Sequence, residues 1–171
     1  MSIRENIEII KKDIPKNVII IAATKKRSMD DINELIDSGI GAIGENYVQE
    51  AENKSKTLDK DVEMHCIGHL QSNKVKKAVE IFDMVQTVDS KKIAKEIDKR
   101  CADIGKVMPV LIELNIGNEV GKKGCMLSKV NELASFISGL NNLNLKGIMT
   151  MGPNLDAKGL RPYFKRAKEV F

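Results

Sequence analysis

Short apolar runs alternate along this chain with longer segments whose apolar residues recur at helical spacing. Residues 3–12 have a helical pattern, and after Pro15 the run 18–24 is typical of a buried strand. Ser28 and Asp31 predict a capped helix start, and Gly39 predicts the end of that helix. The same cycle then repeats to the end of the chain. It predicts strands at 42–43, 63–67, 84–88, 107–116 and 145–151, with helices around 48–51, 72–79, 90–101, 127–140 and 157–171.

About six strand–helix units with short connections indicate an α/β fold built on a parallel sheet with right-handed crossovers. Two architectures satisfy this pattern: an open doubly wound sheet and a (β/α)8 barrel. The glycine-rich GxGxxG motif does not follow the first strand, which weighs against a dinucleotide-binding sheet. Both architectures place their chemistry at the carboxyl ends of the strands.

The length of the chain bears on the barrel. A complete barrel usually takes about 250 residues, whereas this chain has 171, and its last helical pattern runs to Phe171 without a capping signal. We therefore expect residues 1–171 to form a single, incomplete domain that lacks about two units and exposes an open barrel edge.

Composition and charge weigh against several classes of protein. Hydrophobic residues make up 42% and charged residues 30% of the chain, and the net charge of +4 is too small and too evenly mixed to indicate nucleic-acid binding. Three widely spaced cysteines favour a reducing compartment over a disulfide framework. The amino terminus lacks the apolar block of a signal peptide, and no apolar stretch approaches the roughly 20 residues of a membrane span. These observations predict a cytoplasmic protein.

Lys25 is the first candidate for chemistry, since it follows the apolar run 18–23 at the point where a buried strand is expected to give way to a loop. At the mouth of a core its amine would be partly desolvated, which lowers the pKa and makes it a candidate Schiff-base nucleophile. Strand alternation places Lys25 on the same side as Ile21 and Ala23, and Lys26 on the other side. The alternative is that residues 25–27 form a solvated basic turn.

Polar and glycine residues follow nearly every predicted strand. They occupy residues 24–25, 44–46, 68–73, 89–90, 115 and 149–153. Because parallel strands end at one rim, these segments predict a pocket there.

Five segments in this order resemble the pyridoxal phosphate homeostasis protein family: ATKKR (23–27), GENYVQE (44–50), HCIGHLQSNKVKK (65–77), VDS (88–90) and KGIMTMGP (146–153). The resemblance extends from about residue 16 to the end. It implies the (β/α)8 TIM barrel of the alanine racemase N-terminal type, with about six βα units in this chain.

The resemblance also implies a cofactor site. Lys25 would hold pyridoxal 5′-phosphate (PLP) as a Schiff base, Asn46 would lie near the cofactor ring or its hydroxyl, and His69 would line the pocket. Met149 and Thr150 would flank the cofactor from the sixth strand. From the residues alone, Asn46 is equally well explained as a helix N-cap that forms a capping box with Gln49.

The family's phosphate-binding segments, which come from the last two units of the barrel, have no counterpart here, so we expect weak PLP binding. The resemblance implies a monomer that carries PLP, takes part in vitamin B6 homeostasis and serves PLP-dependent apoenzymes, with no catalytic residue and no robust turnover. The alternatives are a PLP-dependent racemase or decarboxylase and an aldolase-like barrel. A racemase needs a second acid/base, and Tyr47 and Tyr163 are the only tyrosines.

Three other sequence patterns do not indicate a further functional site. His65, Cys66 and His69 are zinc-ligand types, but neighbours on a strand point to opposite faces, so we expect no metal site. Residues 121–124 lack the spacing of a phosphate-binding loop. Lys74, Lys76 and Lys77 are expected to form a solvated basic helix end that favours the helix macrodipole.

Overall fold

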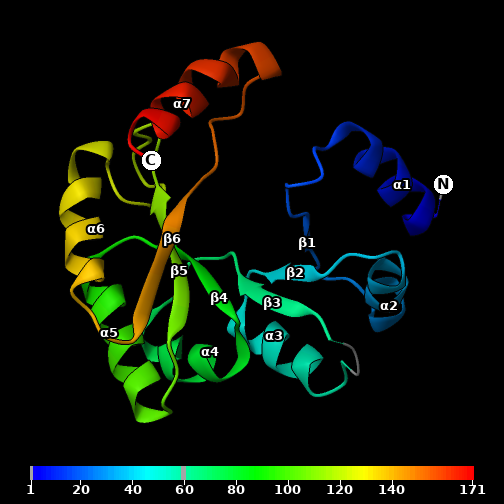
Figure 1. Ribbon diagram of the computed structural model, residues 1–171, viewed down its shortest axis with the longest axis horizontal. Helices are drawn as coiled ribbons and strands as arrows, with labels where there is room; N and C mark the ends of the chain where they lie inside the picture. The colour runs from blue at the N-terminus through cyan, green and yellow to red at the C-terminus, as the bar shows by residue number, and fades with distance from the viewer. Residues whose placement is uncertain (1, 59–60) are drawn as a thin grey trace.

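Strands and helices alternate in the computed structural model, which describes residues 2–58 and 61–171 (Figure 1). The strands are β1 (Ile21–Ala23), β2 (Ala42–Glu45), β3 (Glu63–Cys66), β4 (Met84–Val88), β5 (Met108–Leu114) and β6 (Leu143–Thr150). The helices are α1 (Ile3–Asp13), α2 (Met29–Asp37), α3 (Val48–Ser55), α4 (Val75–Ile81), α5 (Lys91–Asp103), α6 (Val130–Ser138) and α7 (Ala157–Glu169). The predicted alternation is therefore confirmed. Residues 72–74 and 127–129 form short 3-10 turns that precede α4 and α6.

The strand order decides between the two architectures. All pairings between neighbouring strands are parallel, and the order is β1-β2-β3-β4-β5-β6 without a reversal. A doubly wound sheet reverses its order at a switch point, so this sheet is wound in the manner of a barrel. Successive helices contact one another from α3 to α6 and cover one face of the sheet (Figure 1). Strands β1 and β6 are its two edges.

The core lies between the sheet and this layer of helices. Strand β5 shows the twofold alternation clearly, since Met108, Val110, Ile112 and Leu114 are buried while the residues between them are half-buried. Buried side chains of α4 and α5 belong to the same core cluster as these residues of β5. Phe82, the C-cap residue of α4, is fully buried.

Local capping signals are confirmed at α2. Ser28 and Asp31 exchange the two hydrogen bonds of a capping box, and Gly39 follows the helix with a φ of +80°. The Lys11 amine of α1 donates to the carbonyl oxygens of Ser38 at 2.9 Å and Gly39 at 3.1 Å, which ties α1 to the end of α2. Cationic side chains stabilise helix ends of this kind.

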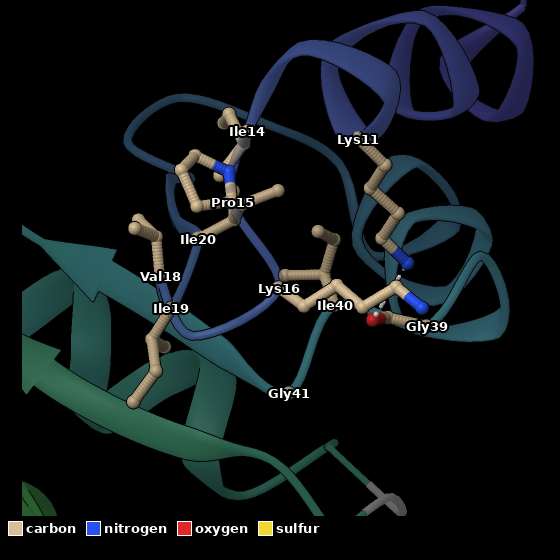
Figure 2. A pocket seen from close by; sticks show the side chains of 10 residues that line it. All are labelled: Lys11, Ile14, Pro15, Lys16, Val18, Ile19, Ile20, Gly39, Ile40 and Gly41. Atoms are coloured by element: carbon tan, nitrogen blue, oxygen red, sulfur yellow. Dashed lines mark hydrogen bonds between the residues drawn. The ribbon is translucent and has the colours of Figure 1, made fainter.

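A cavity of about 340 Å³ lies beside this contact, lined by residues 14–16, 18–20 and 39–41 together with Lys11 (Figure 2). These segments precede β1 and β2, so the cavity opens at the amino ends of the strands. The candidate residues follow their strands and lie at the opposite rim.

Strand β1 is shorter than the predicted strand over 18–24. Its one partner among the described strands is β2, and the residues Val18 and Ile19 are 49% and 77% exposed. An edge strand has a ladder on one side only, and residues 18–20 of the apolar run lie outside the ladder with β2.

The lysines of α4 are exposed, as expected for a solvated face, but the expectation that they favour the helix macrodipole is wrong. The helix begins at Val75, so Lys74 is its N-cap, and Lys76 and Lys77 lie in its first turn, where the helix dipole disfavours cations. The side chains of Glu52 and Glu80 pair with Lys77 and offset that cost. Within the described ranges, no helix is both long and apolar enough to cross a membrane.

Candidate functional site

The sequence-predicted site residues lie at the carboxyl ends of the strands. Lys25 comes two residues after β1, Asn46 directly follows β2, and His69 comes three residues after β3. Met149 and Thr150 are the last two residues of β6. The parallel sheet therefore brings these residues to one rim.

Lys25 lies in a tight turn that begins as β1 ends. The backbone N–H of Arg27 donates to the Thr24 carbonyl oxygen at 3.0 Å, and Lys26 has a φ of +60°. Both lysines are exposed, so the predicted partial desolvation of Lys25 is wrong. The pleat does not separate the two lysines either, because the strand ends at Ala23. The turn, and not the strand, sets their directions.

The amine of Lys54, on α3, lies directly behind this turn. It donates to the Thr24 carbonyl oxygen at 2.7 Å, to Glu45 Oε1 at 2.6 Å and to Glu50 Oε1 at 2.8 Å. The side chain of Lys54 is 9% exposed and that of Glu45 is fully buried. A lysine amine has three N–H groups, and all three are used. We call Glu45, Glu50 and Lys54 the clamp.

The clamp also holds the turn through other groups. The hydroxyl of Thr24 donates to Glu45 Oε1 at 2.5 Å, and the backbone N–H of Lys26 donates to Glu50 Oε1 at 2.6 Å. The hydrogen bond from Lys54 is the main cause that lowers the pKa of Glu50, and the bond from the Lys26 backbone adds to it. Glu50 is therefore anionic at neutral pH. The residues before and after Lys25, Thr24 and Lys26, are both hydrogen-bonded to the clamp.

Asn46 and His69 line one small pocket of about 150 Å³, together with residues 47–49, Cys66, Gln71 and Lys74. Asn46 is not the cap of α3, because Tyr47 holds the N-cap position and makes no side-chain cap bond. Gln49 donates to Glu52 at 3.2 Å, so the predicted capping box is wrong. The helix starts one residue later than that interpretation requires, which leaves Asn46 in the loop at the rim.

Gly68 holds the β2 and β3 loops in contact. A Cβ atom at residue 68 would lie 2.2 Å from the carbonyl oxygen of Asn46. The carbonyl oxygen of Gly68 accepts the Thr87 hydroxyl at 2.8 Å. Such close backbone approach requires glycine, so Gly68 sets the distance between the Asn46 and His69 loops.

Met149 and Thr150 are half-buried on the other edge of the sheet. The Thr150 hydroxyl donates to the Leu114 carbonyl oxygen at 3.1 Å, and Met149 pairs with Glu113 in the register of β5 and β6. Strands β2 to β5 lie between these two residues and β1. The structure thus gathers Asn46 and His69 but does not bring Met149 and Thr150 next to Lys25.

The zinc-ligand types do not converge on one point. His65 Nδ1 lies 2.9 Å from Gln86 Nε2, and His65 Nε2 lies 3.0 Å from Glu63 Oε2. In the part of the chain that the structure describes, no three side chains of His, Cys, Asp or Glu are grouped to hold a metal ion.

Sequence reasoning missed the clamp. Glu50 and Lys54 have the spacing of a helical ion pair, which is a usable signal. Nothing in the sequence places Glu45 within reach of Lys54, since a residue at the end of a strand has no fixed partner on the next helix.

The three cysteines give a direct test of the packing around the site. Burial raises the pKa of the Cys66 and Cys101 thiols to about 11 and also raises that of Cys125. At pH 8 roughly one part in a thousand of Cys66 is then thiolate, the reactive form. We expect the native protein to resist iodoacetamide at pH 8 and all three thiols to react in urea. Rapid alkylation of Cys66 in the native protein would show that the rim is not packed as described.

Comparison with known proteins assigns the family. The alanine racemase N-terminal domain family matches residues 1–171. A pyridoxal phosphate homeostasis protein of Buchnera aphidicola subsp. Schizaphis graminum is 41% identical over 172 residues, which cover 94% of this chain and 75% of that protein.

Solved structures agree with this assignment. PipY of Synechococcus elongatus PCC7942, solved without PLP, has a TM-score of 0.93 and 29% identity over 99% of this chain and 80% of its own. The same protein with PLP bound gives a TM-score of 0.88 at 27% identity, over 99% of this chain and 82% of its own. The six strand–helix units are thus part of an alanine racemase-type (β/α) barrel, and this chain belongs to the pyridoxal phosphate homeostasis protein family.

Proposed function

We propose that this chain carries PLP as a Schiff base on Lys25 and takes part in vitamin B6 homeostasis. The observation that carries the proposal is the exposed Lys25 amine, held at the carboxyl end of β1 on a turn with defined hydrogen bonds. The Buchnera relative is named for PLP homeostasis, and PipY has been solved with PLP bound, which supports the same ligand here.

The residues at the rim fit the aldehyde end of this ligand. Bound PLP supplies an aldehyde that condenses with a primary amine. The amine of Lys54 is buried and donates three hydrogen bonds, so it is not free to react. Lys25 is exposed, and Asn46 and His69 offer polar groups at the ends of neighbouring strands.

The attachment step is a simple condensation. Lys25 would hold PLP through a C=N bond from Nζ to the aldehyde carbon, which would replace the C=O bond with the oxygen leaving as water. The reverse reaction, addition of water, releases PLP. The reversibility of this step suits a carrier that hands PLP to apoenzymes. We propose that the chain acts without robust turnover of its own, as a monomer in the cytoplasm, where three free cysteines stay reduced.

Trapping the cofactor tests the proposal. With one equivalent of PLP, we expect a visible absorption band, and after borohydride reduction an adduct on Lys25 by peptide mass spectrometry. The variant Lys25→Ala is expected to lose the band with little change in stability, since truncating an exposed side chain changes the free energy of unfolding by less than about 0.5 kcal/mol. Lys12→Ala is the matched control. Lys12 is an exposed lysine of α1, and this variant is expected to keep the band. An adduct confined to other lysines would refute the assignment.

A further inference from the structure

We propose that Glu50 and Lys54 are positioning residues that direct PLP attachment to Lys25 instead of to its neighbour Lys26. This inference rests on the proposed function and concerns the choice between two adjacent amines. Burial does not make that choice, because both side chains are exposed. The two residues differ in how their backbone is held.

The backbone of Lys26 is the constrained one. Its φ of +60° lies in the left-handed region, which is strained for an L-residue and persists only where the surroundings impose it. The surroundings here are Glu50, whose carboxylate accepts the Lys26 N–H at 2.6 Å. A charge-assisted bond of this length is among the stronger contacts that a turn can make.

The residue before Lys25 is held by the same cluster. The carbonyl oxygen of Thr24 accepts from Lys54 Nζ at 2.7 Å and from the Arg27 N–H at 3.0 Å. Lys54 also bonds Glu50, so the anchors on the two sides of Lys25 share one buried cation. The Cα–Cβ directions of Lys25 and Lys26 are therefore set together by α3 and cannot exchange while the clamp is intact.

Breaking the contacts of the clamp is expected to reduce the selectivity of attachment between Lys25 and Lys26. Without the Glu50 carboxylate, Lys26 has no partner that compensates its left-handed backbone, and the turn relaxes toward other conformations. Either amine can then reach a ligand at the rim. The measurable consequence is the ratio of Lys25 to Lys26 adducts after trapping.

The experiment uses the full chain and PLP at less than one equivalent, so that the two lysines compete. Borohydride adds hydride to the C=N carbon and a proton is taken up at nitrogen, which fixes each adduct for peptide mass spectrometry. Glu50→Ala is expected to lower the Lys25:Lys26 ratio by about fivefold, the factor equivalent to one lost hydrogen bond. Glu50→Gln keeps an acceptor oxygen for the Lys26 N–H and is expected to retain most of the selectivity.

Glu52→Ala is the matched control. It removes a carboxylate from the same helix that pairs with Lys56 and Lys77, away from the turn, and is expected to leave the ratio unchanged. Amide hydrogen exchange at Lys26 reports whether the clamp has opened, and we expect it to accelerate in Glu50→Ala alone among these variants. Wild-type protein unfolded in urea supplies the ratio of two unpositioned lysines.

The outcomes separate this inference from the proposed function. If wild type forms no adduct on Lys25, the proposed function fails. If wild type labels Lys25 selectively and Glu50→Ala keeps that selectivity, the function stands and the positioning role is overturned. Unchanged exchange of the Lys26 amide in Glu50→Ala would overturn it equally, because Glu50 would then not hold the turn.

Discussion

Replacing Gly68 by Ala is expected to destabilise the protein by about 3 kcal/mol and to displace the Asn46 loop. The added Cβ would lie 2.2 Å from the Asn46 carbonyl oxygen and 2.6 Å from its Cα, and both atoms are backbone that cannot rotate away. Any shift of Gly68 also weakens the hydrogen bond that its carbonyl oxygen accepts from Thr87. Thermal unfolding should show a fall in melting temperature of about 10 °C for a chain of this size.

Gly41→Ala is the control for this substitution. A Cβ at residue 41 would have no heavy atom of the described residues within 4 Å apart from its chain neighbours, and the backbone there is not left-handed. The alanine also reduces the entropy of the unfolded chain, so we expect an unchanged or slightly higher melting temperature. Equal effects of Gly68→Ala and Gly41→Ala would contradict the close contact between the β2 and β3 loops.

Removing the cation of the clamp is expected to have an effect of similar size. Lys54→Met leaves the fully buried carboxylate of Glu45 without its charged partner, and breaking a buried pair in this way costs about 3–5 kcal/mol. Glu45 Oε2 already lacks a hydrogen-bond partner within the described structure, and the Thr24 hydroxyl that donates to Glu45 Oε1 is a neutral donor that does not replace the lost charge. Urea denaturation of the variant, followed by circular dichroism, measures the change.

Two further variants separate burial from charge. Lys56→Met removes a lysine from the same stretch of chain, but the Lys56 side chain is 66% exposed in its pair with Glu52, so we expect a change below about 1 kcal/mol. The double variant Glu45→Gln/Lys54→Met removes both buried charges and is expected to recover part of the stability lost in Lys54→Met. A double variant less stable than Lys54→Met would show that the unpaired Glu45 carboxylate is not the cause.

The clamp also links the fold to the proposed chemistry. The same Lys54 that satisfies a buried carboxylate holds the backbone on the amino side of Lys25. Stability and lysine selectivity therefore depend on shared contacts, which is why the selectivity test relies on Glu50. Its side chain is 25% exposed, so truncation there disturbs the core less than truncation of Lys54.

The amino-acid sequence by itself determined the parts of this protein that depend on near neighbours. Apolar spacing predicted the order of strands and helices, Ser28 and Asp31 predicted the start of α2, and Gly39 predicted its end. The position of Lys25 just after the first strand could also be predicted, because parallel strands deliver their following residues to one rim. These features arise from interactions a few residues apart along the chain.

Only the tertiary structure decided the remaining features. It shortened β1, an edge strand that pairs with β2 alone among the described strands, and so placed Lys25 in an exposed turn instead of at the mouth of a core. It brought Glu45 to Lys54 and Gly68 to Asn46, contacts between segments that no local pattern relates. Strand order and side-chain burial depend on which distant segments pack together. The free energy of that packing comes from the whole sheet and its layer of helices, and no single segment determines it.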